Sequence, residues 1–139
     1  MRIAHLRGCP QELTNCVDSA KREYLPRGIT ETLSTLDFID QGLNVCILGP
    51  SDSGKSYLAK AIGIVACNNY KVEYHHCEIL LEELVALKVA DYSKYQRRLK
   101  KICGAALLIL DDFLFNTLSD EREVKVLFEV LENTIALLS

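Results

Sequence analysis

The stretch "NVCILGPSDSGKSYLAKAIG", residues 44–63, decides the fold. It begins with a short apolar run rich in β-forming residues and ends in a segment with helical apolar spacing. Between these two parts, Gly49, Gly54, Lys55 and Ser56 fit the pattern G-x-x-x-x-G-K-[ST]. A loop of this pattern that leaves a strand and opens a helix is typical of phosphate binding. The stretch therefore predicts a phosphate-binding loop between a strand and a helix.

Each residue type in this loop has a chemical reason to be there. Glycines let the backbone curl so that its N–H groups point at phosphate oxygens. Lys55 reaches the β- and γ-phosphates of a nucleotide, and the Ser56 hydroxyl is offered to Mg²⁺. The helix that follows directs the positive end of its dipole at the same anion. We expect ATP and Mg²⁺ as cofactors, with the nucleotide held by Gly49, Pro50, Ser51, Asp52, Ser53, Gly54, Lys55, Ser56 and Tyr57.

A second motif, "ALLILDD" at residues 106–112, ends an apolar run in two acids. A Mg²⁺ site of the Walker type needs a carboxylate at the end of a hydrophobic strand. Taken alone, an apolar run that ends in two acids is also common where a strand passes into a turn. Here it follows a phosphate-binding loop, and the two motifs together indicate a nucleotide site. We therefore expect Asp111 to hold Mg²⁺, through water and beside Ser56. Asp112 is expected to polarise the attacking water, so that Asp112 and Lys55 are the predicted catalytic residues.

The bulk composition is that of an ordinary globular domain. The 139 residues are 49% hydrophobic and 25% charged, with a formal net charge of −3. This charge gives no overall attraction to nucleic acid or to anionic lipid. No apolar run approaches the ~20 residues of a membrane span, and no signal peptide is visible. The sequence predicts a cytoplasmic location and no membrane partner. Its six cysteines form no CxxC pair, which favours buried or half-buried thiols over a zinc site or disulfides.

Helical and alternating patterns follow one another along the chain. Residues 1–28 form an irregular lead-in, and residues 29–139 form a partial ATP-binding domain. The apolar spacing predicts one helix over residues 29–39 and another over 92–103. Ser119 is expected to cap the last helix, whose predicted buried face consists of Val124, Leu127, Phe128, Leu131 and Ile135. Strands that alternate with helices predict an α/β fold, with a parallel sheet between two helical layers.

Three other groups of side chains have a functional and an ordinary interpretation. His75 and His76 are adjacent, so they point to opposite faces of a strand and cannot share a metal as neighbours; both are interpreted as ordinary strand residues. A basic stripe on the 92–103 helix either contacts DNA phosphates or is a solvated helix face; it consists of Lys94, Arg97, Arg98 and Lys101. Tyr70 and Tyr74 are interpreted as core or surface fillers rather than as a platform for stacked bases.

These motifs together resemble a known family. "NVCILGPSDSGKSYLAKAIG", "YKVEYHHCEILLEEL", "ALLILDDF" and "LSDEREVKVLFEVLEN" are similar to the IstB-type ATPases, over about residues 24–133. These ATPases assist the transposases of insertion sequences, and their relatives, the DnaC-type loaders, place replicative helicases on DNA. The resemblance implies an AAA+ fold that binds ATP with Mg²⁺ and oligomerises. It also implies partners, namely DNA and a transposase or helicase.

Two departures from the family affect the expected fold. The family has an N-terminal extension, and after its last helix it continues into a strand with a polar sensor residue and then to an arginine finger; we expect these to be missing. In AAA+ sheets that strand lies between the strand before the glycine loop and the strand before the acids. Here "NVCIL" and "ALLIL" must pair directly, leave a gap, or receive a short strand from "TIALLS", residues 134–139.

Three functions remain open from the residues. The first is an ATP-driven helper of transposition, with helicase loading as its close alternative. The second is a nucleotide-binding module, or a remnant, that does not hydrolyse ATP because the sensor and the finger are missing. The third is a small-molecule P-loop kinase, which usually places its two Walker strands side by side. The acid pair and the resemblance argue against the kinase.

Overall fold

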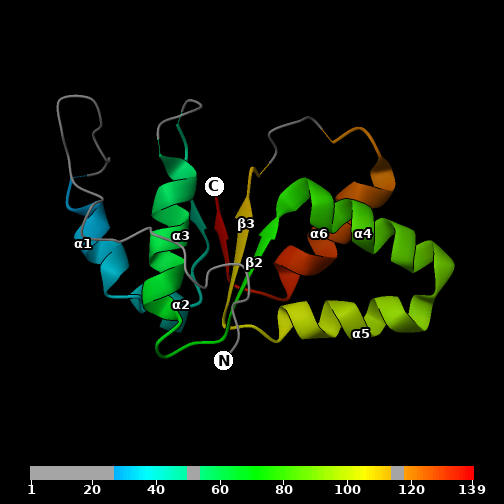
Figure 1. Cartoon of the computed structure of the whole chain (residues 1–139), viewed down its shortest axis with the longest axis horizontal. Helices are drawn as coiled ribbons and strands as arrows, with labels where there is room; N and C mark the ends of the chain where they lie inside the picture. Colours follow the sequence, from blue (N-terminus) through cyan, green and yellow to red (C-terminus); the bar gives the residue numbers. More distant parts are fainter. Residues whose placement is uncertain (1–26, 50–53, 114–117) are drawn as a thin grey trace.

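A parallel sheet of four strands lies in the middle of the structure (Figure 1). The structure is a computed structural model that describes residues 27–49, 54–113 and 118–139. The strand order is β1-β4-β3-β2, and each neighbouring pair is parallel. The strands are β1 (Val45–Cys46), β2 (Val72–His76), β3 (Leu107–Asp111) and β4 (Ala136–Leu138).

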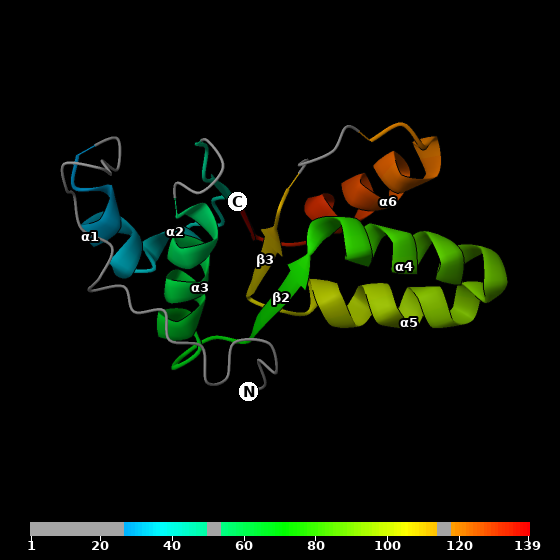
Figure 2. The same ribbon diagram turned by 45° about the horizontal axis from the view of Figure 1, so that its top comes forward.

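Helices cover both faces of this sheet. The first side carries α1 (Ile29–Ser34), α2 (Asp37–Asp40) and α3 (Lys55–Ala66). The second side carries α4 (Cys77–Ala90), α5 (Tyr92–Cys103) and α6 (Glu121–Glu132). Figures 1 and 2 show the two helical groups on opposite sides of the strands in both views. The prediction of a three-layer α/β fold with a parallel sheet is confirmed.

The strand β3 connects the two halves of the core. Its four leucine and isoleucine residues and Asp111 are all buried. Successive side chains of a strand point to opposite faces. Leu107 and Ile109 accordingly join the cluster under α1, α2 and α3, while Leu108 and Leu110 join the cluster under α4, α5 and α6. A continuous apolar run is what a strand covered on both faces requires.

The strand β4 lies between β1 and β3. Leu137 is fully buried and pairs in register with Val45 on one side and with Ile109 on the other. The side chain of Asn44 accepts a hydrogen bond of 2.9 Å from the Ala136 N–H. Of the three alternatives for "NVCIL" and "ALLIL", the short strand from "TIALLS" is therefore confirmed, and the prediction that this strand is missing is wrong. The side-by-side arrangement expected of a P-loop kinase is absent from the described sheet.

The first predicted helix is broken into two. α1 ends at Ser34 and α2 begins at Asp37, because Leu36 has a left-handed backbone with φ of 62°. A right-handed helix cannot continue through a residue in that conformation. The turn places Leu36 and Phe38 in the same buried cluster as Leu33. Apolar spacing alone does not distinguish this turn from one continuous helix.

Four further expectations need correction or lie outside the described residues. The N-cap of α6 is Asp120, whose side chain accepts from the Arg122 N–H, and not Ser119. Phe128 is 60% exposed, because α6 packs inward through Val126, Leu127 and Val130. In "NVCIL" the strand is limited to Val45–Cys46. Of the lead-in assigned to residues 1–28, residues 1–26 lie outside the described residues.

Within the described part of the chain, no helix combines the length and the apolar character needed to cross a membrane.

Candidate nucleotide and metal site

Asp111 and Ser56 meet at the end of β3. Asp111 is the last residue of β3 and is 6% exposed, and Ser56 lies in the first turn of α3. The Ser56 hydroxyl donates a hydrogen bond of 2.6 Å to Asp111 Oδ1. The structure therefore brings together the two residues that the sequence assigned to Mg²⁺, although they are 55 positions apart.

The Asp111 carboxylate accepts hydrogen bonds at both oxygens. Oδ1 also accepts from the Ser139 hydroxyl at 3.0 Å and from the Asp112 N–H at 3.0 Å. Oδ2 accepts from the hydroxyl of Tyr74. Burial opposes ionisation of this group, but hydrogen bonds from Ser56, Tyr74, Ser139 and the Asp112 backbone outweigh it. The pKa of Asp111 is consequently held below its ordinary value, and the carboxylate is charged at neutral pH.

The glycine loop is described at its two ends. Gly54 has a φ of 88°, which glycine adopts without strain, and α3 begins directly after it at Lys55. Among the described residues no side chain caps α3, and its first turn contains no acid. Gly49 is exposed at the other end of the loop, and Tyr57 is half-buried in α3. The predicted contacts of Pro50, Ser51, Asp52 and Ser53 lie outside the described residues.

Asp112 is built differently from its neighbour. Its side chain is 47% exposed, and its backbone has a left-handed φ of 52°. Its carboxylate Oδ2 lies 2.8 Å from Nε2 of His76, at the end of β2. Asp111 thus accepts from Ser56, Ser139 and Tyr74, whereas Asp112 contacts His76.

Sequence reasoning missed three contacts of this site. The interpretation of Tyr74 as a core or surface filler overlooks its hydrogen bond to Asp111. Ser139 is buried and follows β4, where the resemblance placed a polar sensor residue that we expected to be missing. His76 was interpreted as an ordinary strand residue. The alternation of "KVEYHH" places Tyr74 and His76 on one face, and this was the available signal.

The oxygen atoms around Asp111 suit a Mg²⁺ ion that also binds phosphate and water. In the part of the chain that the structure describes, they do not form a site in which protein side chains alone hold a metal. No group of three or more His, Cys, Asp or Glu side chains suited to a metal occurs within residues 27–49, 54–113 and 118–139. Mg²⁺ in nucleotide sites takes one or two carboxylates, with phosphate oxygens and water completing its shell. A charged carboxylate beside a hydroxyl supplies hard oxygen atoms of that kind. His75 does not share a site with His76, since its Nε2 contacts Glu73 Oε2 at 3.1 Å.

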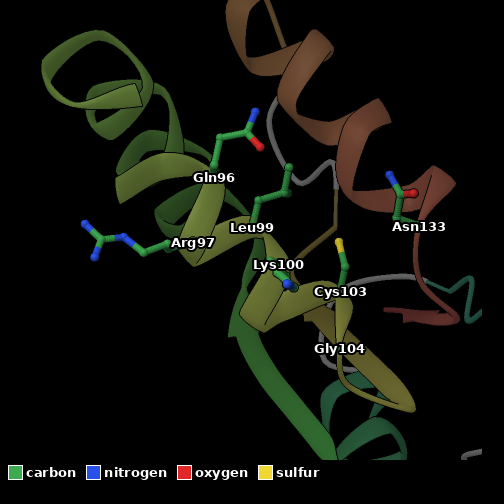
Figure 3. Close-up of a pocket in the computed structure, with 7 residues that line it drawn as sticks. All are labelled: Gln96, Arg97, Leu99, Lys100, Cys103, Gly104 and Asn133. Atoms are coloured by element: carbon green, nitrogen blue, oxygen red, sulfur yellow. The ribbon is translucent and has the colours of Figure 1, made fainter. Parts of the chain in front are cut away.

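A separate hollow of about 570 Å³ lies between α5 and the end of α6 (Figure 3). Gln96 and Leu99 of α5 and Asn133 after α6 line it, and so do two cations of α5, Arg97 and Lys100. Figure 3 shows Arg97 pointing away from α6. None of the predicted nucleotide or metal residues lines this hollow. It is therefore distinct from the site at Asp111.

Comparison with known proteins finds one matching family and several related proteins. Residues 1–138 match the family described as "IstB-like ATP binding protein". A protein of Sinorhizobium fredii named as an insertion-sequence ATP-binding protein is 34% identical over 129 residues, which is 92% of this chain and 49% of that protein. An IS21 protein of Pseudomonas aeruginosa with a similar name is 29% identical over 108 residues, covering 77% of this chain and 40% of that protein.

A solved structure shares the fold. The replication initiator DnaA, bound to AMPPCP and single-stranded DNA, superposes with a TM-score of 0.70 at 22% identity, over 93% of this chain and 41% of that chain. The fold is accordingly of the AAA+ type. The chain spans about half the length of the curated relatives it matches, with 49% of one and 53% of another from Sinorhizobium fredii.

Proposed function

The chain belongs to the family of IstB-like ATP-binding proteins, and we propose that residues 29–139 bind Mg·ATP as an AAA+ module that assists DNA transposition. The 2.6 Å hydrogen bond between Ser56 and Asp111 is the observation that carries this proposal. It unites the end of the glycine loop with the acid that ends β3. A phosphate-bound Mg²⁺ needs oxygen ligands at that junction.

The charge at the start of α3 supports an anionic ligand. Lys55 is the first residue of the helix, and no acid lies in the first turn. A cation at the positive end of a helix dipole is unfavourable by about 0.3–1 kcal/mol. An anion bound there would interact favourably with both Lys55 and the helix. We therefore assign Gly49 to Tyr57 to the nucleotide, with Lys55 on the β- and γ-phosphates.

The acids and hydroxyls have separate proposed tasks. Ser56 and Asp111 would hold Mg²⁺, which when bound neutralises the phosphate charge. Asp112 would orient and polarise water beside the terminal phosphate. Ser139, the residue after β4, would fix the Asp111 carboxylate. This assignment makes hydrolysis a test of Asp112, while nucleotide binding tests Lys55, Ser56 and Asp111.

DNA is the proposed macromolecular partner, and α5 supports that proposal. This helix carries five cations and no acid, namely Lys94, Arg97, Arg98, Lys100 and Lys101. Arg98 pairs with Glu83 at 3.1 Å, whereas the other four are exposed and no ion pair is found for them among the described residues. Exposed cations along one helix suit a phosphate backbone. A transposase partner is proposed from the insertion-sequence names of the relatives, with helicase loading as the alternative. An oligomeric state controlled by ATP is proposed from the resemblance to the IstB-type family alone.

Thermal unfolding with and without Mg·ATP tests the nucleotide proposal. At ~100 times the dissociation constant, ATP should stabilise the chain by about 2.7 kcal/mol. Lys55→Ala should abolish this stabilisation. Lys125→Ala, the same change at an exposed lysine of α6, should retain it. An equal shift in Lys55→Ala, or no shift in the wild type, would contradict the proposal.

Salt dependence tests the DNA contact. Replacement of both Arg97 and Lys101 by alanine should weaken DNA binding and reduce the slope of log affinity against log salt, by about 1 for each lost phosphate contact. Lys125→Ala again serves as the control. An unchanged slope in the double variant would place the DNA contact elsewhere.

A further inference from the structure

One face of β2 contacts both acids of the site. Tyr74 and His76 are two positions apart, so their side chains lie on the same side of the strand. Tyr74 pairs in register with Ile109, and His76 pairs with Asp111. The Tyr74 hydroxyl contacts Asp111, and the His76 ring contacts Asp112. We propose that Tyr74 and His76 are positioning residues, which orient Asp111 for Mg²⁺ and Asp112 for water. This inference rests on the proposed function.

Tyr74 binds the oxygen of the Asp111 carboxylate that the other hydrogen-bond donors do not bind. Ser56, Ser139 and the Asp112 N–H all bind Oδ1, while the Tyr74 hydroxyl binds Oδ2. A carboxylate held at both oxygens cannot rotate about its last bond without breaking a hydrogen bond. Oδ1, the oxygen that contacts Ser56, would then keep a fixed direction toward a metal bound beside Ser56. Partners of this kind affect metal affinity although they do not touch the metal.

The Tyr74 ring is itself fixed in place. It is half-buried against the cluster under α1, α2 and α3, which includes the fully buried Ile109 beside it. The ammonium of Lys60, on α3, lies 5.5 Å from the ring centre, within the range of a cation–π contact. The phenol therefore reaches Asp111 from a packed ring, so its hydroxyl is already oriented before any ligand binds.

His76 acts on Asp112 from the end of the same strand. Its Nε2 is 2.8 Å from Asp112 Oδ2, and its Nδ1 is buried with no hydrogen-bond partner among the described residues. Asp112 has the left-handed φ of 52°, and its N–H is bound to Asp111 Oδ1. The backbone of Asp112 is thus tied to Asp111, while its carboxylate is tied to His76. The imidazole sets the direction in which that carboxylate points.

The opposite face of β2 provides a matched control. His75 lies between the two positioning residues, and its Nε2 contacts Glu73 at 3.1 Å. A change at His75 therefore alters the same strand on the face opposite to Tyr74 and His76. His75→Asn and His76→Asn make the same chemical change on the two faces.

The experiment measures ATP binding across a range of Mg²⁺ concentrations, together with the kcat and KM of ATP hydrolysis, in the full chain. Tyr74→Phe removes only the hydroxyl. It should raise the Mg²⁺ concentration at half-saturation about tenfold and leave ATP affinity without Mg²⁺ unchanged. His76→Asn should lower kcat about tenfold with KM unchanged. His75→Asn should match the wild type in both assays.

Each outcome separates this inference from the proposed function. A wild-type chain that binds no Mg·ATP contradicts the proposed function. If the wild type binds Mg·ATP and Tyr74→Phe has the same Mg²⁺ dependence, the role of Tyr74 is overturned. If the wild type shows no turnover, or His76→Asn and His75→Asn have equal kcat, the role of His76 is overturned. Unfolding midpoints of all variants are measured first, and His76→Gln replaces His76→Asn if the latter does not fold.

Discussion

The strands β1 and β3 carry the two halves of the site, yet they are built very differently. β3 has five buried residues, a strand on each side and helices over both faces. β1 has two residues, of which Val45 is half-buried and Cys46 is exposed, and it lies at an edge of the described sheet. Leu48, just before the glycine loop, is 86% exposed. Asp111 is therefore held by the core of the protein, whereas the loop depends on β4 and, by our proposal, on the nucleotide.

Among the changes predicted here, deletion of residues 136–139 should have the largest effect on the stability of the sheet. β4 is the shared partner of β1 and β3, and Leu137 is fully buried between them. Without β4 both strands expose unpaired backbone, so we expect the cooperative urea transition to disappear. Circular dichroism measures this. Ser139→Ala, which removes one hydroxyl, should keep a cooperative transition. A deleted chain that unfolds at the wild-type urea midpoint would show that β4 does not support the sheet.

Truncation of one side chain in β3 and one in β1 should show the difference in packing between these strands, with a smaller loss of stability than the deletion. Ile109→Ala in β3 creates a cavity at a fully buried position and should cost about 2–5 kcal/mol. Val45→Ala in β1 removes a half-buried side chain and should cost about 1 kcal/mol. Urea unfolding of the two variants gives both values. Equal losses would mean that β1 is as firmly packed as β3.

A fall in pH should destabilise the helical layer of α4, α5 and α6 by protonating Glu129. Its carboxylate accepts from the hydroxyl of the fully buried Tyr95 and pairs with Lys88 at 2.9 Å. The hydrogen bond from Tyr95, with a further contribution from Lys88, lowers the pKa of Glu129 below its ordinary value of 4.5. A lowered pKa in the folded state contributes stability above pH 4.5, and this contribution is lost as the pH falls below that value.

The pH dependence of Glu129→Gln tests this contribution. The stability difference between the wild type and this variant should shrink between pH 7 and pH 3. Glu132→Gln, at an exposed position of the same helix, should differ from the wild type by a smaller amount. Urea unfolding at pH 7, 5 and 3 provides the measurement. A difference that stays constant across this range would show that Glu129 does not stabilise the layer through its charge.

The smallest effect is expected at Phe128. Because this side chain is 60% exposed on α6, Phe128→Ala should change the free energy of unfolding by no more than about 0.5 kcal/mol. Val130→Ala, at a position 1% exposed on the same helix, should cost several times more. A large loss of stability in Phe128→Ala would show that Phe128 belongs to the buried face of the helix, as the sequence predicted.

Sequence patterns predicted the parts of the site that depend on short spacing. The glycine loop, Ser56 and the acids at the end of "ALLILDD" follow from residues that are close together in the chain. The alternation of strands and helices was sufficient for the layers of the fold. Those features are encoded locally, and for that reason they could be predicted.

The missed features depend on positions across the sheet. The hydrogen bond from Tyr74 to Asp111 requires the register in which Tyr74 pairs with Ile109, and no single segment contains it. Ser139 reaches Asp111 because β4 enters between two strands that are distant in sequence. The break at Leu36 depends on a backbone φ of 62° that leucine rarely adopts. Tertiary packing determined each of these three.

The position of β4 also has a consequence for biosynthesis. Asn44 and Ala136, which meet beside β1, are 92 residues apart. A ribosome that adds roughly 5–20 residues per second needs about 5–18 s to cover that distance. During this time β1 and β3 of a nascent chain both lack β4, the strand that lies between them in the described sheet. Neighbouring nascent chains on one polysome would offer the same open edges to each other, so this protein should fold best where its translation is sparse or chaperoned.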